Sequence, residues 1–232
     1  MKYTSALVTA ASGSLKGITA SHNKGGAYLR GRVTPTNPNS AQQIAVRAAL
    51  SQLAQAWNTD LSAVQRTAWN LYASNVSRVN SLGAAVHLSG LQEYIRSNAS
   101  RLQAGVARVD DAPTQFDSGQ LTVPAAGLID TLTAPNVLKI GFANTDPWAI
   151  AAGGYLLVYA SAAQNPGISF FKGPFRFVGK VTGAATPPTS PATIPTTLLL
   201  PIVAAKTTFV QVRASAPDGR LTEAVIASKS AS

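Results

Sequence analysis

Residues 89–113 read SGLQEYIRSNASRLQAGVARVDDAP, and the periodicity of the sequence changes inside this stretch. Ser89 and Gln92 have the spacing of a capping box, so we predict a helix from Ser89 to about residue 102. Gly105 is the expected stop after this helix. Beyond Asp-Asp-Ala-Pro at residues 110–113, apolar residues recur at every second position and turn residues at about every tenth. The stretch therefore predicts where a helical part gives way to a β-rich part.

Two more helices are predicted upstream of this boundary. The first should begin just past Asn39-Ser40 and end near Trp57, and the second should follow a capping box of Ser62 and Gln65. We expect these two helices to form a hairpin. The apolar side chains expected to face the core are Val46, Leu50, Leu53 and Trp57 in the first helix, Val64, Ala68, Leu71 and Tyr72 in the second, and Leu91, Tyr94, Ile95, Ala99 and Leu102 in the third.

Seven or eight short strands are predicted after the boundary. The Asp218-Gly219 pair supplies the positive-φ turn chemistry of a hairpin between the last two. Strands of this length and spacing are typical of an immunoglobulin-like or fibronectin-III-like sandwich. The predicted strands are 120–123, 126–132, 137–143, 155–160, 175–181, 196–203, 207–214 and 221–227.

The first 40 residues differ from both of these parts. They contain several glycines and few large apolar side chains, so no independent core is expected. Residues 27–33 alternate as an extended strand does, with Tyr28, Arg30 and Arg32 on one side and Leu29 and Val33 on the other. We therefore predict an α+β chain with three parts: an extended basic arm at 1–40, a helical domain at 41–108 and a β-sandwich domain at 109–232.

The charge of the chain is low in density and uneven in position. Charged residues make up 12% of the chain, about half the usual fraction, and the net charge is +10. Residues 1–108 contain eleven Lys and Arg against two acidic residues, Asp60 and Glu93. Low surface charge favours self-association, and a basic half favours an acidic partner. A homo-oligomer with a basic contact surface is therefore expected, unless these charges are only a solvated face.

Catalytic chemistry finds no support in the sequence. The chain has no cysteine and only two histidines, His22 in the arm and His87 in an apolar stretch, where a hydrogen-bonded structural role is expected. Asp110 and Asp111 are adjacent in what we interpret as a solvating linker, and no spacing suits zinc or calcium. We predict a protein that is not an enzyme, with no catalytic, cofactor-binding or metal-binding residues.

The amino terminus shows no signal peptide, and no stretch approaches the roughly 18 continuous apolar residues of a membrane span. We therefore expect synthesis in a cytoplasm and no membrane partner.

Three segments carry a family resemblance: GSLKGITASHNKGGAYLRGRVTPTNPNSAQQIAVRAALSQLAQAW from residue 13, AVQRTAWNLYA from residue 63 and LSGLQEYIRSNASRL from residue 88. Their Gly-rich basic arm, Asn-Pro-Asn-Ser-x-x-Gln and Gln-Arg-x-x-Trp resemble a poorly characterised family of bacteriophage and prophage virion-associated proteins. The resemblance covers residues 13–105. It implies a structural protein of a tailed-phage virion, made in the host cytoplasm, whose partners are other capsid, connector or tail subunits.

The arm supplies the candidate partner-binding residues. They are Lys24, Tyr28, Leu29, Arg30, Arg32 and Val33. In the favoured interpretation the arm pairs with a neighbouring subunit. In the alternative, these cations follow a nucleic-acid backbone while Tyr28 stacks on a base. Few cations, and no series of aromatic residues beside them, make this evidence for nucleic-acid binding weak. A third alternative is a host-surface or glycan-binding role for the β-rich half, for which uncharged loops around Pro187, Pro188 and Pro191 are permissive.

Overall fold

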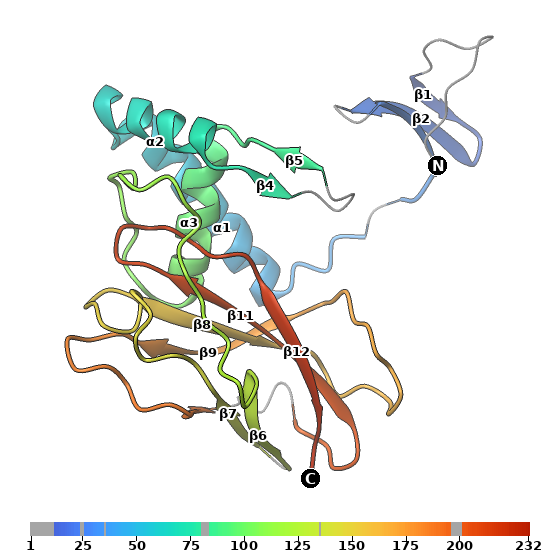
Figure 1. The fold of residues 1–232 in the computed structure, drawn as a ribbon. Helices are drawn as coiled ribbons and strands as arrows, with labels where there is room; N and C mark the ends of the chain where they lie inside the picture. The colour runs from blue at the N-terminus through green and yellow to red at the C-terminus, as the bar shows by residue number, and fades with distance from the viewer. Residues whose placement is uncertain (1–11, 24–25, 35, 80–83, 135, 196–200) are drawn as a thin grey trace. The chain divides into compact units, whose positions relative to one another are not determined.

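The computed structural model describes residues 12–23, 26–34, 36–79, 84–134, 136–195 and 201–232. The chain forms two compact units, Met1–Ala41 and Gln42–Ser232. Across the described residues, helices combine with antiparallel sheets, so the α+β class is confirmed (Figure 1).

The N-terminal unit contains a three-stranded antiparallel sheet. Its strands are β1 (Gly13–Leu15), β2 (Ile18–Asn23) and β3 (Gly26–Gly31), in the order β1-β2-β3. The prediction of one extended strand over residues 27–33 is thus wrong in two respects. The strand ends at Gly31, and it pairs with β2 of its own chain. A tight turn at Lys16, whose φ is 47°, lets β1 fold back on β2.

The second unit begins with three helices, α1 (Ala41–Thr59), α2 (Ala63–Asn75) and α3 (Gly90–Gln103). Both predicted capping boxes are confirmed: Ser62 and Ser89 accept from the backbone N–H three residues on, and Gln65 and Gln92 bond back to the cap N–H. Gly105, with φ at +66°, follows the end of α3 as predicted. A short hairpin of β4 (Arg78–Val79) and β5 (Ala85–Val86) lies between α2 and α3 in the chain.

The helix packing differs from the prediction. The predicted hairpin of the first two helices is wrong, because α2 packs along α3 instead. The expected apolar face of α2 is right in part: Tyr72 is buried as predicted, but Val64 is 78% exposed and Leu71 is 54% exposed. Trp69 is also buried, and its ring meets those of Tyr72 and of Tyr94 of α3 edge-on.

Two antiparallel sheets follow the helices. One has the order β10-β7-β6 and the other β12-β11-β8-β9. Their strands are β6 (Ile129–Thr133), β7 (Val137–Ile140), β8 (Tyr155–Ala160), β9 (Arg176–Thr182), β10 (Ala192–Pro195), β11 (Thr207–Ser215) and β12 (Val225–Ser230).

The four-stranded sheet is covered on both faces. Alternate side chains of β8 show this, since Leu156 and Val158 lie in a core shared with the three-stranded sheet, whereas Leu157 packs with Val106 and Leu221 on the helix side. The unit therefore has three layers: helices, the four-stranded sheet and the three-stranded sheet (Figure 1).

Five of the predicted strands correspond to β6, β7, β8, β9 and β11, and the predicted turn at Asp218-Gly219 is confirmed by a positive φ of +91° at Gly219. The segment 120–123 is not a strand. The last strand, β12, begins four residues later than predicted. Of the predicted strand 196–203, residues 196–200 lie outside the described residues and 201–203 are not in a strand. The strand β10 at 192–195 was not predicted.

Helix α3 is joined to its surroundings by polar side chains. Asn98 accepts from the Val109 N–H at 2.7 Å and donates to the Val109 carbonyl at 3.0 Å. Arg101, 4% exposed, donates to the Ala107 and Ala216 carbonyls and to the Ser215 hydroxyl. These bonds join α3 to the loop that follows it and to the end of β11.

The segment 109–113 is part of this packing. Asp110 accepts from the Tyr94 hydroxyl at 3.2 Å, and Asp111 accepts from Gln65 at 2.8 Å. The interpretation of Asp110 and Asp111 as a solvating linker is therefore wrong, because both carboxylates bind the helices. Helices and sheets belong to one compact unit, Gln42–Ser232. The predicted division into domains at 41–108 and 109–232 stays a prediction.

A buried ion pair gives the first testable prediction. Arg78 and Glu93 are 6% and 0% exposed and form two bonds of 2.9 and 3.0 Å, while Arg78 also reaches Glu223, which is 60% exposed. Glu93→Gln should lower the free energy of unfolding by roughly 3–5 kcal/mol, because it leaves a buried guanidinium uncompensated. Glu223→Gln should cost under about 1 kcal/mol, since water screens that carboxylate. Urea unfolding measures both changes. Equal losses of unfolding free energy in the two variants would contradict the prediction that the Arg78–Glu93 pair contributes more to stability than the Arg78–Glu223 pair.

The aromatic cluster predicts loss of stability at high pH. Burial raises the pKa of Tyr72 and of Tyr94 from 10.0 to about 12. Because an unfolded chain ionises first, both tyrosines stabilise the fold fully below about pH 10, and this contribution is lost as pH rises toward about 12. Urea midpoints measured across this window should fall. Tyr72→Phe should weaken the pH dependence, and an unchanged slope in this variant would contradict the prediction.

Candidate interaction surfaces

The N-terminal sheet has one apolar and one polar face. Residues paired directly across antiparallel strands share a face, so the register assigns each side chain. The pairs Leu15–Ile18 and Ala20–Leu29 lie on one face, and the pair Thr19–Arg30 lies on the other. The apolar face carries Leu15, Ile18, Ala20, Ala27 and Leu29, together with His22. The polar face carries Ser14, Thr19, Ser21, Tyr28 and Arg30, and a 2.9 Å hydrogen bond joins Ser14 to Thr19.

The apolar face of this sheet is exposed at the turn between β1 and β2, and Ala20, Ala27 and Leu29 on the same face are half-buried. Leu15 is 78% exposed and Ile18 is 54% exposed. None of the side chains described within residues 12–34 is buried. A three-stranded sheet depends on a covered hydrophobic face for its stability. The sheet is therefore amphipathic but has no core among its described residues.

The six predicted arm residues do not lie on one face of the sheet. Tyr28 and Arg30 lie on the polar face of β3, and Leu29 lies on the apolar face. Arg32 and Val33 follow the strand and are exposed, Val33 at 79%. Lys24 lies outside the described residues. The predicted alternation of Tyr28 and Leu29 is thus confirmed, whereas the second strand that fixes the two faces was missed.

A groove lies between α1, α3 and β11 in the second unit. Its volume is about 610 Å³. One wall is the first half of α1, with Ala45, Val46, Ala49 and Leu50. These residues continue the apolar stripe of α1, whose second half is buried at Leu53. The stripe was predicted from spacing, but Val46 and Leu50 remain 47% and 43% exposed.

The opposite wall and the floor of the groove combine apolar and cationic groups. Ala99 and Leu102 of α3 face the stripe, and Leu221 and Arg213 line the groove from the sheet side. Arg96 also lines it and is held by the carbonyls of Leu221 and Thr222 and by the Glu223 carboxylate. The Nε of Arg213 is buried and has no hydrogen-bond partner within the described part of the chain.

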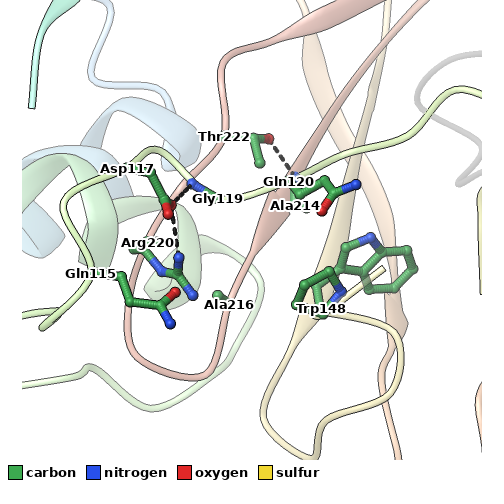
Figure 2. A pocket seen from close by; sticks show the side chains of 10 residues that line it. Gln115, Asp117, Gly119, Gln120, Trp148, Ala214, Ala216, Arg220 and Thr222 are labelled. Atoms are coloured by element: carbon green, nitrogen blue, oxygen red, sulfur yellow. Dashed lines mark hydrogen bonds and ion pairs between the residues drawn. The ribbon is translucent and has the colours of Figure 1, made fainter. Parts of the chain in front are cut away.

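A second cavity of about 330 Å³ lies beside the β11–β12 turn (Figure 2). Arg220 lines it and is bonded to Asp117 at 2.7 Å and Asp218 at 2.8 Å, while Asp117 also accepts from the Gly119 N–H. Burial opposes ionisation of Asp117, but the Gly119 N–H and Arg220 outweigh it and lower its pKa. Trp148, also in the lining, is 1% exposed and bonds to Asp146. The charges of this cavity are thus already paired within the protein.

Both histidines lie on the surface: His22 is exposed on β2, and His87 is exposed after β5. The hydrogen-bonded structural role expected of His87 stays a prediction. Within the described ranges, no group of three or more His, Cys, Asp or Glu side chains is placed to hold a metal ion. No helix in the described part of the chain has the length and apolar composition needed to cross a bilayer.

Comparisons with known proteins give no match: no family model, no curated protein and no solved structure is significantly similar to the chain. The phage family suggested by residues 13–105 therefore stays a hypothesis based on those motifs.

Proposed function

We propose that the chain is a non-enzymatic structural protein of a tailed-phage virion, a capsid-associated cement or decoration protein or a connector or tail component. One observation carries the proposal: the N-terminal sheet has an apolar face that is exposed at one end, with Leu15 and Ile18 more than half exposed. Such a face gains stability when a partner covers it. In this proposal, the partner is a neighbouring virion subunit, either a copy of the chain or a different protein.

The two faces of the sheet favour a protein partner over nucleic acid. An apolar face buries little against a phosphate backbone, whereas it packs well on a protein surface. The opposite face carries Arg30 beside Tyr28 and polar side chains, so it can remain in water while the apolar face is covered. A nucleic-acid-binding packaging role, supported only by the excess of cations in residues 1–108, is the alternative.

We further propose that residues 109–232 form a fibronectin-III-like sandwich that packs on neighbours or faces outward. Strand order supports this. Counting from β6, strands one, two and five form one sheet, and strands three, four, six and seven form the other. Immunoglobulin constant domains differ in placing the fourth strand in the first sheet. A glycan-binding role for this half gains little from the cavity in Figure 2, since buried Trp148 offers no exposed stacking surface.

The proposal is tested by charge substitutions on opposite faces of the same sheet. Leu15→Lys with Ile18→Lys should lower incorporation into particles about tenfold or more, because each places a charge in the covered face. The matched variant, Ser14→Lys with Thr19→Lys, changes the charge of the same strands equally and should leave incorporation near wild type. Mass spectrometry of purified particles measures both.

Two outcomes would contradict the proposal. The first is absence of the wild-type chain from particles, and the second is equal incorporation of the two variants. Tight binding of a short DNA duplex that weakens steeply with salt would instead support the nucleic-acid alternative. Sedimentation of the wild-type chain over a range of concentrations decides whether the partner is a second copy.

A further inference from the structure

The groove between α1, α3 and β11 is lined by the kind of side chains that helices use to pack against one another. In α1, Ala45, Val46, Ala49 and Leu50 recur with the spacing of a helix–helix contact. Farther along the same face, Leu53 is fully buried against the other helices. The first half of α1 therefore presents to the groove the kind of surface that its second half uses to pack.

The dimensions of the groove suit a helix. Small side chains on both walls, Ala45 and Ala49 on α1 and Ala99 on α3, allow a third helix to approach closely. A volume of about 610 Å³ is within the range of ligand-binding clefts and accepts the few anchor side chains of an amphipathic helix at positions i, i+3, i+4 and i+7.

The charge of the groove points to an acidic occupant. Arg96 and Arg213 are the charged residues among its lining, and no carboxylate lines it. Arg96 is already held by Glu223 and by two carbonyls. Arg213 lines the groove, and none of the ion pairs among the described residues includes it. A carboxylate that enters the groove would form a charge-assisted pair with the part of this guanidinium that faces the groove.

The helices of a second copy of the chain do not offer this chemistry. The sequences of α1 and α2 contain no acidic residue, and the acidic residue of α3 is Glu93, which is fully buried against Arg78. None of the three helices could therefore bring an exposed carboxylate to Arg213 of another copy.

We propose that this groove binds an amphipathic helix of a different protein, with apolar side chains on the α1 stripe and a carboxylate on Arg213. The inference goes beyond the proposed virion role and does not depend on it, because it rests on the groove alone.

A pair of helical peptides tests the proposal on the full-length chain. Both are side-chain-stapled and carry the same leucines at i, i+4 and i+7, but one has two glutamates beside this stripe and the other has two lysines. Added to the isotope-labelled protein, the glutamate peptide should shift the NMR signals of Ala45, Ala49, Ala99 and the Arg213 side chain. It should bind about tenfold or more tightly than the lysine peptide, because only it can pair with Arg213.

Variants locate the site and control for general charge effects. Arg213→Gln should reduce the affinity for the glutamate peptide to that for the lysine peptide, and Val46→Glu should abolish binding. The matched control is Val64→Glu, which introduces the same charge at a 78% exposed valine of α2 outside the groove and should leave binding unchanged. Circular dichroism checks that each variant is folded. The two-peptide comparison on the wild-type chain needs no variant.

Several results would overturn the proposal. Equal binding of the two peptides would mean that the groove does not recognise charge, and no signal shifts at about millimolar peptide would mean that it does not bind such a helix. If Val46→Glu dissociates an oligomer of the chain while neither peptide binds, the occupant is a second copy. If dodecanoate shifts the groove signals and the peptides do not, the occupant is a small amphiphile.

Discussion

The buried guanidinium of Arg101 is the interaction on which the arrangement of the second unit depends. It lies at the last turn of α3 and donates to the Ala107 carbonyl, the Ala216 carbonyl and the Ser215 hydroxyl, with the ring of Tyr155 at 5.3 Å. It thereby joins the helix to its own following loop and to the end of β11. Burial lowers the pKa of Arg101, and several oxygens compensate for the lost hydration. Because Asn98 and Glu93 add directional bonds on the same helix, α3 has little freedom to rotate about its axis. This fixed rotation turns Ala99 and Leu102 toward the groove.

Features set by local chemistry were predictable from the sequence. The capping boxes at Ser62 and Ser89 depend on residues three apart, and β8 is a clear apolar run, so both were located to within a residue. The buried side of α3 was predicted only in part: Tyr94 is buried as expected, but hydrophobic periodicity does not count Glu93, Ser97, Asn98 and Arg101 as core. The strand β10 was missed because prolines at both ends indicate a turn more strongly than a strand.

The candidate surfaces were predictable only in part, for a related reason. The alternation of Tyr28 and Leu29 is visible in the sequence, but the pairing of β3 with β2 that builds a whole apolar face depends on hairpin register. Likewise the α1 stripe was predicted, but not its division at Leu53 into a buried and an open half. That division depends on where α2 and α3 end against it, which local sequence does not encode. The identification of Arg213 required its position in the groove lining, which depends on how β11 packs against the helices.

The partly exposed apolar face of the N-terminal sheet has a consequence for the timing of assembly. Under the proposed function, a sheet that lacks its own core acquires its cohesion from the surface that receives it, so ordering and attachment become a single coupled equilibrium. The N-terminal sheet of a free subunit would then become ordered only when a surface that can receive it is present. In such a scheme, the order in which particle components are added is determined by which surfaces have already been built, without any need for a dedicated timing signal.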